Sequence, residues 1–125
     1  MPYARVVSGI PIRGDAWTWW RTAQGRYRRS SRAAVGSVLA LKRTRRLRLG
    51  HVAVVRRIVN NRIIVVDHAN WLNRGRVHRA TPVIDVSAAN DWSAVRVWYT
   101  PGRKLGARTY PAYGFVHPGR MISSL

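Results

Sequence analysis

Two runs of β-branched residues on either side of a short polar pair constrain the fold of this chain most strongly. The first run covers residues 50–55 (GHVAVV), and the second covers residues 62–71 (RIIVVDHANW). Val and Ile are enriched in strands, and the Asn60-Asn61 pair between the runs is typical of a tight turn. The pattern predicts an antiparallel hairpin, in which a turn centred on the two asparagines places His51 opposite Asn70.

The remaining segments predict two helices before the hairpin and further strands around it. Short helices are expected at 3–8 and 16–23, the second with Asp15 as its N-cap. Strands are expected at 36–41, 83–86 and 95–99, and the Gly- and Pro-rich residues from Pro101 onward are expected to wrap over the sheet as a long tail. Because the helices precede the strands, we predict an α+β fold with an antiparallel sheet of about five strands, in a single domain over 1–125.

Composition excludes several classes of protein. The chain has 125 residues, of which 46% are hydrophobic, and this is enough for one domain with its own core. It contains no cysteine, so the printed chain holds neither a disulfide nor a thiolate metal site. No apolar run approaches the roughly 18 residues of a membrane helix, and Met1 to Arg5 are not followed by the apolar stretch of a signal peptide. We expect no membrane span.

The charge is strongly positive, with 23 Lys and Arg residues against 4 Asp and Glu residues and a formal net charge of +19. Such a charge indicates anionic partners in general. The densest run lies at 42–48 and offers Lys42, Arg43, Arg45, Arg46 and Arg48 for contacts with a polyanion. The alternative interpretation of this run is a solvated loop between two strands.

Three polar residues near the ends of the predicted hairpin form the candidate site. His51 begins the first strand, and His68 and Asn70 lie near the end of the second. Residues two apart on a strand share a face, so His68 and Asn70 point the same way while Asp67 points the other way. A catalytic base needs a group that fixes its tautomer, and a neighbouring His or Asn supplies one. A purely structural pair of histidines is the alternative, because a nucleophile is missing.

Four stretches, taken in order, give the chain a resemblance to a known family. They are residues 3–5 with 8–10 (YAR, SGI), 14–17 (GDAW), 36–39 (GSVL), and 50–54 (GHVAV) followed by 68–71 (HANW). Together they resemble the CHAP family of cysteine- and histidine-dependent amidohydrolases and peptidases. The resemblance implies a papain-like fold, a secreted or cell-envelope location, no cofactor and no metal. It also implies cleavage of amide or peptide bonds in peptidoglycan by a thiolate at the start of the first helix.

The resemblance also implies roles for individual residues. The family's catalytic histidine matches His51, and its orienting residue falls on His68 or on Asn70, between which the sequence does not decide. Trp71, because it lies next to Asn70, and Tyr3 are expected to line the substrate groove, with packing in the core or at its rim as the alternative for Trp71. The expected partner is therefore peptidoglycan or another anionic polymer of the cell wall, with nucleic acid as a partner of low sequence preference.

The family's nucleophile has no counterpart in the printed chain. CHAP proteins that resemble this one open their first helix with Cys-Val-Pro-Tyr-Ala-Arg, whereas this chain opens with Met1-Pro2-Tyr3-Ala4-Arg5. A GTG codon encodes Val internally and Met where it initiates, so we expect a truncated start with Cys immediately upstream. A pseudoenzyme that lost its nucleophile is the alternative. A restored thiol is expected to have its pKa lowered by the helix dipole and by His51 as imidazolium.

Two other functions compete with this interpretation. The charge alone would support a basic domain that binds polyanions or nucleic acid, although the sequence has no helix-turn-helix, zinc-finger or RNA-recognition signature. A zinc hydrolase would use His51, His68 and Asp85 as ligands, but it would lack the His-Glu-x-x-His helix that is typical of that class.

Overall fold

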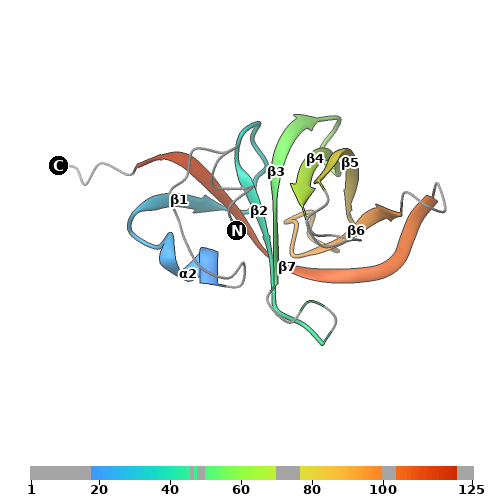
Figure 1. Ribbon diagram of the computed structural model, residues 1–125, viewed down its shortest axis with the longest axis horizontal. Helices are drawn as coiled ribbons and strands as arrows, with labels where there is room; N and C mark the ends of the chain where they lie inside the picture. Colours follow the sequence, from blue (N-terminus) through green and yellow to red (C-terminus); the bar gives the residue numbers. More distant parts are fainter. Residues whose placement is uncertain (1–17, 46, 48–49, 70–76, 100–103, 121–125) are drawn as a thin grey trace.

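The part of the chain that the structure describes folds mainly as β-strands, with a single short helix. The computed structural model describes residues 18–45, 47, 50–69, 77–99 and 104–120 (Figure 1). In these residues the elements follow in the order α2 (Trp19–Thr22), β1 (Tyr27–Ser30), β2 (Val38–Leu41), β3 (His51–Ile58), β4 (Ile63–Ala69), β5 (Val77–Asp85), β6 (Ala94–Tyr99) and β7 (Lys104–Arg120). The prediction of a papain-like α+β fold with a helical pair on about five strands is therefore wrong.

All the described strands belong to one antiparallel sheet. Its order is β1-β7-β2-β3-β4-β5-β6, and β7 also pairs with β6. This additional pairing closes six of the strands into a barrel and leaves β1 as an extension on β7. Figure 1 shows β7, coloured orange to red, running across the molecule from the closed part of the sheet to the end where β1 and α2 lie.

The longest strand lies where the sequence predicted a tail. Gly and Pro are normally depleted in strands, and this is why the composition after Pro101 misled the prediction. Here they mark irregular positions within β7, which pairs with β1, β2 and β6 in turn. Gly114 has a φ of 137°, and a Cβ atom there would come within 2.5 Å of the Ser30 carbonyl oxygen. The register with β2 shifts at the same point, between Ala40 and Leu41.

The predicted hairpin is present as β3 and β4. Val54 pairs with Asp67 and Val55 pairs with Val66, which is the register expected from a turn centred on Asn60-Asn61. Nearer to the turn the register shifts by one residue, between Val55 and Arg57. The strands expected at 36–41, 83–86 and 95–99 are also present with different limits, whereas β1 was not predicted.

Alternating residues of β2 and β3 face two separate cores. On one face, Val38, Ala40, Val52 and Val54 pack against Trp19 of α2. On the other face, Leu39, Leu41, Ala53 and Val55 pack in the barrel interior with residues that include Phe115. Both faces are buried, and this explains why the two strands are almost continuously apolar in sequence.

Only part of the predicted helical region lies within the described residues. Of the helix expected at 16–23, the structure describes Trp19–Thr22, with Thr18 rather than Asp15 as its N-cap. Gly25, with a φ of 75°, follows it as the predicted helix end. The helix expected at 3–8 lies outside the described residues. Among the residues that the structure does describe, we find no helix of the length and hydropathy required to cross a membrane.

Candidate active site

His51 and His68 form a buried pair at one end of the barrel. The Nε2 atom of His51 lies 2.9 Å from the Nδ1 atom of His68, which is hydrogen-bonding distance. Their ring centroids are 5.1 Å apart and the ring planes meet at 71°. The two residues are 4% and 1% exposed. Of the predicted site residues, these two are therefore brought into direct contact.

Strand periodicity explains why the two imidazoles meet. His51 lies on the same face of β3 as Ala53 and Val55, which belong to the barrel core. His68 lies on the same face of β4 as Ile64 and Val66, which belong to that core as well. Both side chains thus continue the interior rows of their strands at the end of the barrel. Gly50, with a φ of 69°, turns the chain into β3 immediately before His51.

Two residues of β5 extend the site, and the sequence analysis missed both. The hydroxyl oxygen of Thr81 lies 3.2 Å from Nε2 of His68. His78 is paired with His68 in the sheet, and the centroids of their rings are 5.8 Å apart. The predicted strand began only at Val83, so neither residue was placed beside the hairpin.

Burial keeps both imidazoles of the pair neutral at neutral pH. Desolvation, reinforced by the neighbouring His68, lowers the pKa of His51 to about 3. Desolvation and the nearby His78 lower the pKa of His68 to about 4, against a smaller opposite effect of Asp67. A neutral imidazole accepts a proton, so His51 is in the form that a general base requires.

The hydrogen bonds of the pair allow a consistent arrangement of the protons, whose direction depends on the tautomers. In the arrangement that suits a general base, Nδ1 of His51 is the acceptor. For Nδ1 to be an acceptor in the neutral ring, Nε2 carries the hydrogen and donates it to Nδ1 of His68. His68 then carries its own hydrogen on Nε2 and donates it to the Thr81 hydroxyl. In this arrangement each of the two hydrogen bonds that join His51, His68 and Thr81 has one donor and one acceptor.

Asp67 lies on the opposite face of β4, as its position between two inward-facing residues predicts. Its carboxylate accepts hydrogen bonds from Nε of Arg56 at 3.0 Å and from the backbone N–H of Ala80 at 2.7 Å. Ala80 has a φ of 54°, in a region that residues other than Gly rarely adopt. The carboxylate therefore holds a bend of β5 next to Thr81 instead of orienting a histidine.

Comparison with known proteins yields one match. A family model of the CHAP domain matches residues 1–70, which is more than half of the chain and includes both histidines of the pair. The chain belongs to the CHAP domain family. No curated protein and no solved structure matches it. CHAP domains are peptidoglycan hydrolase-type domains, and they typically occur in secreted or cell-envelope proteins.

Several predicted site residues of this CHAP domain lie outside the described residues. They are Asn70, Trp71, Tyr3, Arg46 and Arg48. The expected position of Asn70 opposite His51 and the expected substrate groove therefore stay predictions. The three other basic residues of the 42–48 run, Lys42, Arg43 and Arg45, are exposed.

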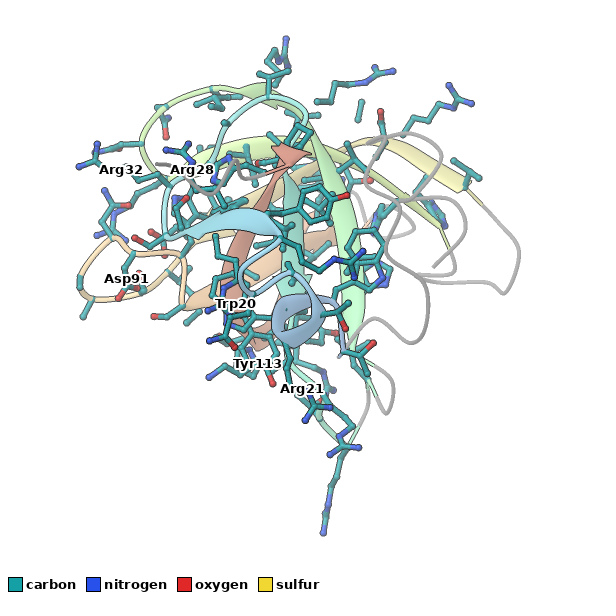
Figure 2. All side chains as sticks on the ribbon, turned by 90° about the vertical axis from the view of Figure 1, so that its left-hand side faces the viewer. Trp20, Arg21, Arg28, Arg32, Asp91 and Tyr113 are labelled. Atoms are coloured by element: carbon teal, nitrogen blue, oxygen red, sulfur yellow. The ribbon has the colours of Figure 1, made fainter. Side chains whose placement is uncertain are left out.

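Lys42 belongs to a stack of aromatic and cationic side chains. The rings of Trp20 and Tyr113 stack at 5.8 Å with their planes 8° apart, and both lie on the face of the molecule seen in Figure 2. Arg29 lies over Trp20 and Lys42 lies over Tyr113, at 4.6 and 5.2 Å from the ring centroids. Cation–π contacts therefore fix Lys42 against the surface of the CHAP domain.

Asp85 does not join the two histidines. Its carboxylate is 1% exposed and accepts hydrogen bonds from the backbone N–H and the hydroxyl of Ser87, at 2.9 and 2.6 Å. It organises the β5–β6 turn, so the zinc site considered for His51, His68 and Asp85 is not assembled. Within the described ranges of this CHAP domain, no three candidate ligand residues are placed to hold a metal ion.

Proposed function

We propose that this CHAP domain belongs to a cysteine amidase or endopeptidase of peptidoglycan, in which His51 is the general base. The observation that carries the proposal is the contact of 2.9 Å between Nε2 of His51 and Nδ1 of His68 inside the barrel end. Cysteine hydrolysis requires a base beside the thiol and a second group that fixes the base in one tautomer. A neutral, buried His51 held by His68 has the properties that this chemistry needs.

His68 is the positioning residue in this proposal. It accepts the Nε2 hydrogen of His51 and passes its own hydrogen to Thr81, so the imidazole of His51 keeps Nδ1 as its acceptor. When His51 takes up a proton, the positive charge faces a neutral imidazole and not a carboxylate. The ion pair with a thiolate then stabilises the imidazolium, and the His51–thiolate pair titrates as a unit.

The proposed reaction needs a cysteine thiol beside His51, and a test chain supplies one when Cys-Val replaces Met1. The printed chain contains no cysteine, and we propose that it hydrolyses no peptidoglycan. In the extended form the thiol would transfer its proton to Nδ1 of His51 and attack the carbonyl carbon of an amide bond. The leaving amine would then take the proton back from His51, and water would release the acyl group from sulfur.

Dye release from purified, dye-labelled cell walls tests this function. We would compare the printed chain, a chain in which Cys-Val replaces Met1, and the His51→Ala variant of the extended chain. We expect lysis by the extended chain alone. The control is the extended chain with Ser in place of the added Cys, which keeps the length and removes the thiol. Lysis by the printed chain, or an extended chain that is folded and inert, would overturn the mechanism.

We also propose that the basic surface binds an anionic polymer of the cell wall. A shallow pocket of about 180 Å³ brings Arg45 of the 42–48 run together with Arg108 of β7, with the hydroxyl-bearing Thr44 and Thr109 beside them. Two guanidinium groups and two threonines suit phosphate or carboxylate groups on a chain. Binding through charge alone would be sensitive to salt and would hold a hydrolase at its substrate.

A further inference from the structure

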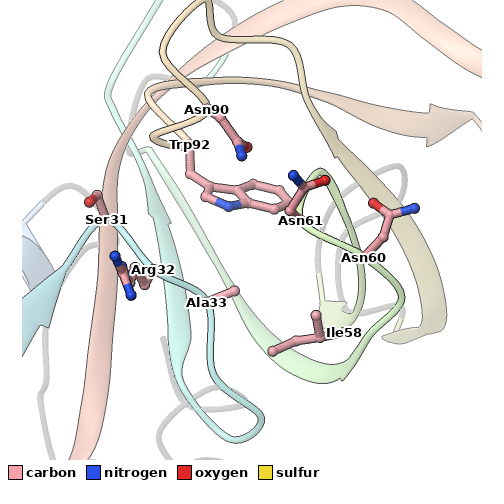
Figure 3. Close-up of a pocket in the computed structure, with 8 residues that line it drawn as sticks. All are labelled: Ser31, Arg32, Ala33, Ile58, Asn60, Asn61, Asn90 and Trp92. Carbon is pink, nitrogen blue, oxygen red and sulfur yellow. The ribbon is translucent and has the colours of Figure 1, made fainter.

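A second pocket lies at the end of the barrel remote from the histidine pair. It has a volume of about 310 Å³ and is lined by residues of three connections, among them Arg32, Ile58, Asn60, Asn90 and Trp92 (Figure 3). Ile58 ends the strand that His51 begins, and at about 3.3 Å per residue the two ends of β3 are about 23 Å apart. The pocket is therefore a separate site and not part of the proposed catalytic centre.

The wall of the pocket formed by the β5–β6 turn is held in a defined conformation. Asn90 and Trp92 have φ values of 53° and 61°, which are unusual for residues with side chains and costly for Trp. The buried carboxylate of Asp85 compensates by accepting hydrogen bonds from Ser87 and, at 3.4 Å, from the backbone N–H of Trp92. The indole ring also packs edge to face on Phe115, with centroids 5.8 Å apart.

Asn90 connects this turn to the β3–β4 turn on the other side of the pocket. In the amide orientation that satisfies both neighbours, its nitrogen donates to Asp85 at 2.7 Å and to the carbonyl oxygen of Asn61 at 2.8 Å. The amide oxygen of Asn90 then remains as an acceptor in the pocket lining. The two turns are thus fixed to each other before any ligand binds.

The polar groups of the lining are mostly donors, and the charge is positive. Figure 3 shows the nitrogen edge of the Trp92 indole turned toward the side where Ala33 and Ile58 lie. This N–H makes no hydrogen bond within the part of the chain that the structure describes. The Asn60 oxygen accepts the backbone N–H of Arg62 at 2.9 Å, which leaves the two amide hydrogens of Asn60 for a ligand. Arg32 brings a guanidinium group, and no carboxylate lines the pocket.

We propose that this pocket binds a small ligand group in which a carboxylate stands beside an amide. Arg32 would pair with the carboxylate, and the donors of Asn60 and Trp92 with the acceptor of Asn90 would match an amide carbonyl and an amide N–H. Ile58 would contact a methyl or methylene group between them. The volume is at the lower end of the range for ligand pockets, which fits a dipeptide end or one sugar residue.

Two components of a cell wall carry this chemistry, and the assignment to a wall ligand rests on the proposed function. One is the carboxyl end of a wall peptide, and the other is an acetamido sugar that bears a carboxylic acid. Either would give the domain a second binding site for its substrate, about 23 Å from the proposed base by the strand rise used above. A second binding site of this kind raises the effective concentration of the cell-wall substrate near His51.

Nuclear magnetic resonance on the ¹⁵N-labelled chain tests the pocket directly. The signals of the Trp92 indole N–H and of the Asn60 side-chain amide are followed during titration with N-acetyl-alanyl-alanine, in its L and D forms, and with N-acetylmuramic acid. The matched probes without a carboxylate are N-acetyl-alanyl-alanine amide and N-acetylglucosamine. We expect saturable shifts for at least one acidic probe and about tenfold weaker binding of its neutral counterpart.

Two arginine variants provide the matched comparison. Arg32→Gln removes the charge in the pocket, whereas Arg28→Gln removes an exposed arginine of β1 that does not line it. We expect Arg32→Gln to weaken binding of the acidic probe about tenfold and Arg28→Gln to leave its affinity unchanged. Three results would overturn the proposal. They are equal affinity for acidic and neutral probes, an equal loss of affinity in both arginine variants, and no shift of the Trp92 indole signal. The measurement needs no catalysis, so inert cell walls combined with intact probe binding would overturn the proposed function alone.

Discussion

The imidazole of His51 meets that of His68 edge to face inside the barrel, with 2.9 Å between Nε2 of the first ring and Nδ1 of the second. Burial of both rings lowers their pKa values, with a further contribution from a neighbouring histidine in each case, and the contact between the rings couples the tautomer of one to that of the other. The proposed catalysis and the pH dependence of stability therefore involve the same two buried residues, and each can be measured separately.

The first prediction concerns His68 and Thr81 in the Cys-extended chain. His68→Ala should lower kcat by about 10² to 10⁴, because the His51 imidazole loses the partner that fixes its tautomer. Thr81→Val, which keeps the shape and removes the hydroxyl, should lower kcat less, by about tenfold. Both changes should also displace the acid limb of the pH–rate profile, which a loss of packing alone would not do. Arg79→Gln, an exposed change on the same strand, is the control.

A result in which His68→Ala leaves kcat and the pH profile unchanged would contradict the positioning role of His68. In that case Asn70→Ala becomes the decisive variant, because the family resemblance allows either residue as the orienting group. Circular dichroism of each variant shows whether a loss of activity comes from a loss of folding.

The second prediction concerns stability against pH. The folded state keeps His51 and His68 neutral, whereas the unfolded chain protonates both near the ordinary value of 6.5. The free energy of unfolding should therefore be fully retained above about pH 6.5 and should fall as the pH is lowered toward 4. Each histidine contributes a slope of up to about 1.4 kcal/mol per pH unit in this window.

Urea unfolding at several pH values between 4 and 8 measures that slope. The double variant His51→Gln with His68→Gln should show a shallower dependence than the original chain, whatever its absolute stability. An identical slope in both proteins would show that the pH dependence has another origin.

The third prediction concerns Gly114. An alanine there would place its Cβ 2.5 Å from the Ser30 carbonyl oxygen and 3.0 Å from the Trp20 ring, at a φ of 137°. We expect Gly114→Ala to destabilise the fold by about 3 kcal/mol, because backbone has to move and an unfavourable conformation is imposed. Gly25→Ala has open space around it at a φ of 75°, so only the conformational cost of about 1 to 2 kcal/mol is expected. Urea unfolding measures both changes, and an equal loss of unfolding free energy in Gly114→Ala and Gly25→Ala would contradict the steric argument.

The fourth prediction concerns binding to charged polymers. Arg45→Gln and Arg108→Gln should each weaken binding to phosphate-rich cell walls and reduce the slope of log K against log salt by about one. Arg26 is an exposed arginine outside that pocket, so Arg26→Gln should change the affinity and the salt slope less. Unrelated DNA sequences should bind weakly and alike, and a strong preference for one sequence would contradict the wall-binding interpretation.

The local pattern around the hairpin predicted that His68 and Asp67 face opposite sides of their strand, but it left open whether His68 or Asn70 lies beside His51. Two apolar runs and a central Asn60-Asn61 pair determine which residues of β3 and β4 lie opposite each other, because side chains alternate with a period of two. His68 therefore faces the same side as the barrel core and Asp67 faces away, as predicted. The same reasoning could not find Thr81, because Pro82 cannot donate to the sheet and made Val83 the natural start of the next strand.

Sequence alone determined the β3–β4 hairpin, the presence of strands near 36–41, 83–86 and 95–99, the strong positive charge and the resemblance to the CHAP family. Tertiary structure decided the architecture, because the closing of β7 onto both β2 and β6 depends on contacts between residues far apart in the chain. Gly106, Pro111 and Gly114 disfavour a strand by local propensity, yet pairing with β1, β2 and β6 supplies the hydrogen bonds that make β7 the longest strand of the sheet. The lowered pKa of His51 was decided in the same way, since only the assembled barrel end removes water from its ring.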